Sequence, residues 1–146
     1  MQADADTRSL RLLVVEDEAI IAMLVEDALT MAGHVVVGVA ESASEALTIA
    51  ARETIDLALC DVRLSENDSG VTVARELSLR GIPCLYVSGN CPTAADHPLI
   101  IGCVGKPFAT AALSRAVEAA YRIAAGERGV EVPKSMHVFA RDGTVP

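Results

Sequence analysis

The sequence predicts an α/β fold in which helices cover both faces of a doubly wound parallel sheet. Five short apolar runs alternate along the chain with longer segments whose apolar residues recur at helical spacing. The short runs show little polar alternation, which is typical of strands buried on both faces. Since strand–helix–strand units cross over in the right-handed sense, such units build a parallel sheet between two helical layers.

The predicted strands are runs rich in Leu, Val and Ile, most of which end at a polar residue or at glycine. They cover residues 10–15, 35–39, 55–61, 83–88 and 100–105, and the last is the weakest. Ligand sites in sheets of this kind lie at the carboxyl ends of the strands, near the switch in strand order. The residues that follow each strand are therefore the ones to inspect for chemistry.

Four helices are predicted, at residues 19–32, 42–53, 71–80 and 110–125. The second begins at a capping box formed by Ser42 and Glu45. One apolar face of the first helix consists of Ile20, Leu24, Ala28 and Met31. The inner face of the last consists of Leu113, Val117, Ala120 and Ala124. Residues 89–99 leave little room for another helix because they contain two prolines and begin with glycine.

Composition places the chain among cytoplasmic proteins of one domain. It has 146 residues, 51% of them hydrophobic, so a sizeable core forms without disulfides. No apolar run approaches the roughly 20 residues of a membrane span, and the polar first residues do not resemble a secretory signal. The net charge of −8 argues against a nucleic-acid partner, which needs clustered basic residues.

The cysteines and histidines match no metal-ligand spacing. Cys60, Cys84 and Cys103 lie in or beside apolar runs, so we expect reduced thiols that pack as small hydrophobes. We expect Cys91 to lie in a loop where it is accessible to redox chemistry, although nothing near it argues for a lowered pKa. His34, His97 and His137 are scattered, and we expect surface or loop positions for them.

Charged and hydroxyl side chains follow four of the strands in the same register. They are Glu16 and Asp17, then Asp61, then Ser88, then Lys106. Two carboxylates 4 Å apart repel by about 4 kcal/mol at an effective dielectric near 20, and one lysine does not balance three of them. A hard divalent cation with oxygen ligands resolves the excess, so this edge of the sheet is predicted to bind Mg²⁺.

The segments LVVEDE, LALCD, YVSGN and GKPF, as a set, resemble the receiver domain of bacterial response regulators, over about residues 10–125. The resemblance implies a flavodoxin-like sheet with strand order 2-1-3-4-5. It also implies a signalling switch that takes a phosphoryl group from a histidine kinase or histidine phosphotransfer protein. The switch phosphorylates and dephosphorylates itself, is not a turnover enzyme, and acts on an unidentified downstream protein.

The resemblance also implies a role for each site residue. Asp61 matches the phosphoacceptor, and Asp17 matches the carboxylate that binds Mg²⁺ together with it. Glu16 matches the acid that acts through metal-bound water. The position of Arg63 matches the one whose backbone carbonyl binds the metal.

The other matched positions act on the phosphoryl group. Ser88 matches the hydroxyl that hydrogen-bonds it, and Lys106 matches the lysine that pairs with a phosphoryl oxygen. Pro107 matches a proline that often follows a cis bond. Arg63 and Asn90 flank the expected path of the hydrolytic water, where we expect them to tune the lifetime of the phosphorylated state.

Two positions depart from the usual pattern. Cys103 stands where most receivers carry an aromatic residue that swings inward on activation, so that switch does not carry over intact. The segment that contains Tyr86, Ser88 and Gly89 instead resembles the Phe-Ala-Thr-Gly-type motif of a receiver subgroup. Members of that subgroup have a shortened fourth helix. Tyr86 as an ordinary core aromatic remains an alternative. The loop after Asp61 is slightly long, and we expect Glu66 and Asp68 in it to be solvated.

We expect an N-terminal arm at 1–9, a receiver domain at 10–126 and a tail at 127–146. The tail is too short for an output domain, and we expect it to pack back partly through Val138 and Phe139. Three alternatives remain. One is a degenerate receiver that binds proteins without phosphorylation. Another is a phosphatase with an aspartate nucleophile, which would need a second aspartate where Arg63 stands. The third is a cofactor-binding flavodoxin-like protein, which would need a phosphate-binding loop after the first strand.

Overall fold

A computed structural model describes residues 9–64 and 69–140 of the chain. Its strands are β1 (Arg11–Val15), β2 (Val35–Ala40), β3 (Leu57–Asp61), β4 (Cys84–Ser88), β5 (Ile100–Gly105) and β6 (Met136–Val138). Its helices are α1 (Ala19–Met31), α2 (Ala43–Arg52), α3 (Gly70–Leu79) and α4 (Thr110–Ala124). None of the helices in these residues is long and apolar enough to cross a bilayer.

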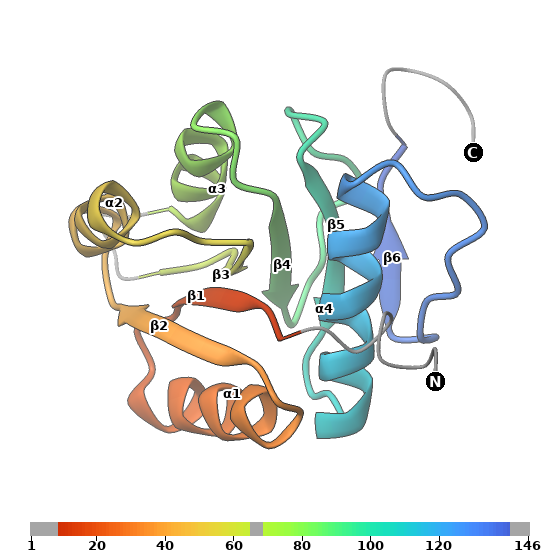
Figure 1. Cartoon of the computed structure of the whole chain (residues 1–146), viewed down its shortest axis with the longest axis horizontal. Helices are drawn as coiled ribbons and strands as arrows, with labels where there is room; N and C mark the ends of the chain where they lie inside the picture. The colour runs from red at the N-terminus through yellow and green to blue at the C-terminus, as the bar shows by residue number, and fades with distance from the viewer. Residues whose placement is uncertain (1–8, 65–68, 141–146) are drawn as a thin grey trace.

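One sheet forms the centre of the molecule, with helices on both faces (Figure 1). Its strand order is β2-β1-β3-β4-β5-β6. The first five strands are parallel, as predicted, and all residues of β3 and β4 are buried. The prediction of five strands misses β6, which adds to the β5 edge in the antiparallel sense.

The two faces of the sheet carry separate apolar cores. One core packs α1 and α4 against the sheet, through residues such as Val25, Leu29 and Leu113. The other packs α2 and α3, through residues such as Ile49 and Leu77. This arrangement covers the central strands on both sides and leaves their carboxyl ends as the accessible rim.

The expected apolar face of α1 is wrong. Ile20, Leu24 and Met31 are 73%, 51% and 87% exposed, whereas the helix buries Ala22, Val25, Ala28 and Leu29. The helix carries apolar residues on both of these faces, so periodicity alone does not select the buried one. By contrast, the inner face predicted for α4 is confirmed, with Leu113, Val117 and Ala120 fully buried.

Two local features fix the helices that flank the site. The Ser42 hydroxyl accepts a hydrogen bond from Glu45 N at 3.2 Å, which confirms the predicted cap of α2. Gly70 begins α3 against the end of β3, and a Cβ there would overlap the backbone carbonyl oxygen of Asp61. Glycine therefore allows α3 to begin close to the end of β3. The expectation that Glu66 and Asp68 are solvated lies outside the described residues.

Residues 89–99 contain no helix, in agreement with their prolines. The chain passes from β4 to β5 through bends and turns. The resemblance of the Tyr86–Gly89 motif predicted a shortened fourth helix between these strands, and residues 89–99 form none.

The tail packs back onto β5, as expected for Val138 and Phe139. Phe139 is 3% exposed, and its N–H donates to the Ile101 carbonyl at 3.0 Å. Its ring meets that of Tyr86 edge-on, with 6.1 Å between the centroids. Gly102 permits this approach, because a Cβ there would overlap the His137 carbonyl oxygen. Residues 136–139 are thus part of the fold.

One expectation for a single residue is wrong: Cys103 is not a reduced thiol, because it forms a disulfide with Cys91. His34 lies in the loop between α1 and β2, in agreement with the predicted surface or loop position, but it is buried there. Its Nδ1 accepts a hydrogen bond from Leu10 N at 3.1 Å, and its Nε2 lies 3.5 Å from a Glu118 carboxylate oxygen. His34 joins the start of β1 to α4, a contact that no spacing in the sequence reveals.

Candidate functional site

Sheet register brings the predicted acids together. Val15 at the end of β1 pairs with Cys60 of β3, so Glu16 and Asp61 follow the same row of the sheet. Carboxylate oxygens of Glu16, Asp17 and Asp61 lie within 4.8 Å of one another. Glu16 and Asp61 are buried, and Asp17 is half-buried. The sequence-based prediction of an acidic cluster at this rim is therefore confirmed in its geometry.

Lys106 reaches the same point from the end of β5. Its Nζ lies 3.2 Å from Glu16 Oε1 and 3.3 Å from Asp61 Oδ2. Its backbone N–H donates to the Ser88 carbonyl at 2.8 Å, and the bond to Pro107 is cis. Burial alone would lower the pKa of Lys106, but the two carboxylates outweigh it and raise the pKa. The ammonium is therefore a permanent cation of the site.

Glu16 is the carboxylate whose negative charge Lys106 does not balance. Burial raises its pKa to about 7, assisted by the hydrogen bond and charge of Asp61 and opposed by the Glu18 N–H and Lys106. At neutral pH the Glu16 carboxylate is therefore not fully ionised, with one lysine as counter-charge. A divalent cation would supply the missing positive charge, and a set of carboxylate oxygens suits Mg²⁺. The residues present fit that ion.

A cleft of about 470 Å³ opens over the acids. Its lining residues are Asp17, Glu18, Asp61, Arg63, Ser88, Gly89, Asn90 and Lys106. The Arg63 N–H donates to Asp61 Oδ1 at 3.1 Å, and its side chain is exposed. The cleft therefore gathers all the sequence-predicted site residues except Glu16, which lies beneath it against Lys106.

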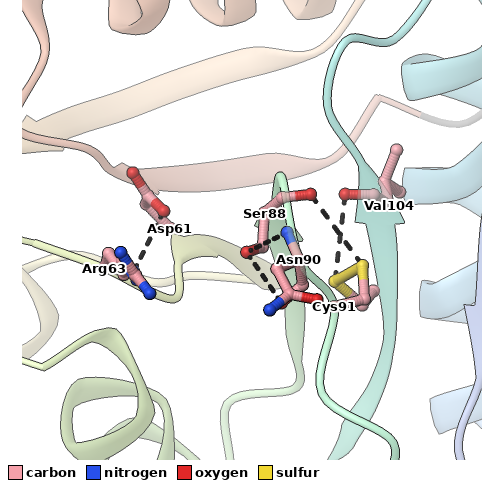
Figure 2. The surroundings of a disulfide bond; sticks show 7 residues. Asp61, Arg63, Ser88, Asn90, Cys91 and Val104 are labelled. Carbon is pink, nitrogen blue, oxygen red and sulfur yellow. Dashed lines mark hydrogen bonds between the residues drawn. A yellow bond between two sulfur atoms is a disulfide. The ribbon is translucent and has the colours of Figure 1, made fainter.

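The Ser88 hydroxyl is held by the loop that follows it. Its oxygen accepts from Asn90 N at 3.0 Å and lies 3.2 Å from the Asn90 carbonyl, to which it donates. Figure 2 shows Ser88 and Asn90 between Asp61 on one side and Cys91 with its disulfide on the other. In this arrangement the hydroxyl is engaged with its own loop.

Sequence reasoning missed two features of the site. The Glu18 N–H donates to Glu16 Oε2 at 3.2 Å and fixes that carboxylate. The Cys91–Cys103 disulfide borders the site, and its pairing depends on how the loop returns to β5. No cysteine motif signals that pairing, because the two residues lie 12 apart with no C-x-x-C pattern.

Comparison with known proteins identifies the family. Residues 12–118 match the response regulator receiver domain. This chain belongs to the receiver domain family. Receiver domains are signalling switches, not turnover enzymes, and phosphorylation and Mg²⁺ binding at an acidic pocket are typical of them.

Similar proteins include several called PhyR. The phyllosphere-induced regulator PhyR of Methylorubrum extorquens is 29% identical over 113 residues, covering 75% of this chain and 42% of that protein. The PhyR structure from Brucella abortus aligns with a TM-score of 0.72 at 27% identity, covering 83% of this chain and 52% of that one. The chain thus spans about half the length of these relatives.

A second kind of receiver aligns over its whole length. The signal receiver domain of a modulated diguanylate cyclase from Desulfovibrio desulfuricans G20 gives a TM-score of 0.69 at 25% identity. The alignment covers 81% of this chain and 98% of that one. Receiver architecture therefore accounts for most of this chain.

Proposed function

We propose that this chain is a phosphorylation-controlled response regulator whose phosphoacceptor is Asp61. The donor is a phosphohistidine on a histidine kinase or histidine phosphotransfer protein in the cytoplasm. The output is contact with a downstream protein. One observation carries the proposal: Lys106 Nζ lies within 3.3 Å of Asp61 at the floor of an acid-lined cleft.

The chemistry is a phosphoryl transfer between two side chains. A carboxylate oxygen of Asp61 attacks phosphorus in line, a P–O bond forms, and the P–N bond to the donor histidine breaks. Mg²⁺, held by Asp17, Asp61, the Arg63 carbonyl and, through water, Glu16, would offset charge on the phosphoryl oxygens. Lys106 is placed to pair with one phosphoryl oxygen, and the Ser88 hydroxyl to hydrogen-bond another.

Reset follows when water attacks the aspartyl phosphate and releases inorganic phosphate. Arg63 and Asn90 line the same cleft as Asp61 and Ser88, each two residues further along the chain. We therefore assign them to controlling the approach of water, and so the lifetime of the phosphorylated state.

A second candidate is binding of a protein partner without phosphorylation. The observation that favours it is the exposed apolar face of α1, whose members Ile20 and Met31 are 73% and 87% exposed. The anti-anti-sigma factor PhyR from Bartonella quintana, whose name implies a protein-binding role, has a structure similar to that of this chain. This chain spans about half of that protein, so the role is a hypothesis here.

The deciding experiment is intact mass spectrometry after incubation with Mg²⁺ and a small phosphodonor. We expect wild type to gain one phosphoryl group and Asp61→Asn to gain none. Asp27→Asn, an exposed acid on α1, is the matched control and should behave as wild type. EDTA should abolish the gain. A wild-type protein that stays unmodified would contradict the proposal and favour the second candidate.

A further inference from the structure

The Cys91–Cys103 disulfide ties the loop of the candidate site to the edge of the sheet. Cys91 follows Ser88 by three residues, and its sulfur lies 4.0 Å from the Ser88 carbonyl oxygen (Figure 2). Cys103 is on β5, where it pairs in register with Tyr86 of β4 and with His137 of β6. The bond therefore joins the segment that carries Ser88 to a strand fixed on both sides.

The other two cysteines provide an internal comparison. Cys60 and Cys84 lie on neighbouring strands, are fully buried and remain thiols. A hydrogen bond with Cys84 and then burial raise the pKa of the Cys60 thiol, which lowers its reactivity. Of the four cysteines, Cys91 alone is not fully enclosed. A solution oxidant or reductant therefore reaches Cys91 first.

Both redox states of the pair fit their surroundings. In the disulfide, neither sulfur carries a hydrogen. Reduction would separate the two sulfurs, and each lies beside a carbonyl oxygen that can accept from the thiol formed, that of Ser88 at 4.0 Å from the Cys91 sulfur and that of Val104 at 3.8 Å from the Cys103 sulfur. Because an unpaired buried donor is costly, these acceptors make the reduced form structurally acceptable.

The disulfide also affects how the Ser88 hydroxyl can contact a phosphoryl group on Asp61. Its hydroxyl accepts from Asn90 N and donates its proton to the Asn90 carbonyl, so it donates to a phosphoryl oxygen on Asp61 only by giving up the bond to that carbonyl. The Asn90 carbonyl competes for the proton as long as residues 89–91 keep this position. With Cys91 bonded to β5, these residues are restrained in it; with two thiols, they are not.

We propose that Cys91 and Cys103 are an oxidation site whose disulfide restrains the Ser88 loop and weakens engagement of the phosphoryl group. This inference rests on the proposed function. Disulfides in reducing compartments are usually transient and redox-sensing, which suits one beside a switch. The site would then respond both to phosphorylation and to the thiol–disulfide balance.

The oxidation balances with a small-molecule disulfide such as glutathione disulfide. The Cys91 thiolate attacks one glutathione sulfur, forms a mixed disulfide and releases the first glutathione thiol. The Cys103 thiolate then attacks the Cys91 sulfur and releases the second. Two protein thiols are oxidised, and one glutathione disulfide is reduced to two thiols. Reduction runs in reverse and starts at the more accessible Cys91.

The test is calorimetric titration of the intact chain with beryllofluoride in the presence of Mg²⁺. Beryllofluoride mimics a phosphoryl group on Asp61. Wild type is compared after treatment with glutathione disulfide and after reduction, with reagents removed. Native alkylation and mass spectrometry confirm the redox state of Cys91. We expect the oxidised form to bind about tenfold more weakly, a typical coupling between sites. Cys91→Ser should bind like reduced wild type both before and after treatment with glutathione disulfide. Untreated Cys103→Ala should also bind like reduced wild type.

Each other outcome has a definite meaning. Equal or tighter binding by the oxidised form overturns the inference and leaves the proposed function standing. Failure of glutathione disulfide to form the Cys91–Cys103 bond also overturns it. If neither redox form binds beryllofluoride, the proposed function fails and the inference falls with it.

Discussion

The two sides of the site are built differently. The acid side, formed by Glu16, Asp17 and Asp61, follows β1 and β3, which are central strands joined to each other in register. The loop side, formed by Ser88, its loop to Cys91, and the β5–β6 edge, depends on a disulfide and on the C-terminal tail. The difference teaches that the central strands position the three carboxylates, whereas contacts at the edge of the sheet position the Ser88 hydroxyl.

The strongest test of the loop side is Phe139→Ala. Phe139 is almost fully buried against Tyr86, and Phe→Ala changes in cores cost about 3–5 kcal/mol. Urea denaturation should show a loss of that size in the free energy of unfolding. The matched control is Val132→Ala, at a residue that is 37% exposed and should change stability by less than about 0.5 kcal/mol. Similar small losses for both variants would mean that the tail does not support the fold.

Ser88→Ala tests the chemistry of the loop side without changing the acid side. It leaves the acids and Lys106 in place and removes only the hydroxyl. A hydrogen bond to a charged group contributes about 1.5–3 kcal/mol, so affinity for beryllofluoride with Mg²⁺ should fall roughly 10- to 150-fold. Phosphoryl gain on Asp61 should persist, at a lower rate. Ser44→Ala, exposed on α2, is the control. Unchanged affinity in Ser88→Ala would remove the hydroxyl from the proposed chemistry.

The last test concerns the acid side and pH. The pKa of Glu16 is about 7 in the folded chain against 4.5 for the free group. Between these values the folded state holds a proton that the unfolded state has lost, so stability should fall as pH rises. The slope cannot exceed about 1.4 kcal/mol per pH unit for one proton.

Denaturation in EDTA from pH 5 to 8 measures this effect. Glu16→Gln should lose less stability over that range than wild type, while Glu76→Gln, exposed on α3, should parallel wild type. Mg²⁺ should offset the loss at the upper end, because the ion binds the ionised carboxylate. A Glu16→Gln curve with the same slope as wild type would refute this assignment.

The sequence was sufficient to predict the acid side. Hydrophobic runs located the central strands, and the register of a parallel sheet then brings Glu16, Asp17 and Asp61 together whatever the loops do. Lys106 was predicted by the same logic, since β5 was located correctly at 100–105. Strand ends are marked by residues that are adjacent in the sequence, and they could therefore be predicted from the sequence alone.

Apart from Ser88, the loop side could not be predicted, for physical reasons. β6 has three residues, too few for a periodic pattern to identify it. Disulfide pairing depends on the path of a loop without regular structure. His34 is buried through contacts with the distant Leu10 and Glu118. Each of these features is decided by tertiary contact, which a single sequence does not encode locally.

The three-residue length of β6 has a consequence for the surface of the sheet. Unpaired strand edges are templates on which other chains add strands, and long flat edges aggregate most readily. Here β6 covers part of β5, leaves only a short edge of its own, and presents the exposed imidazole of His137. Along Gly102–Val104, the side of the sheet nearest the disulfide is therefore closed to strand addition by a neighbouring copy.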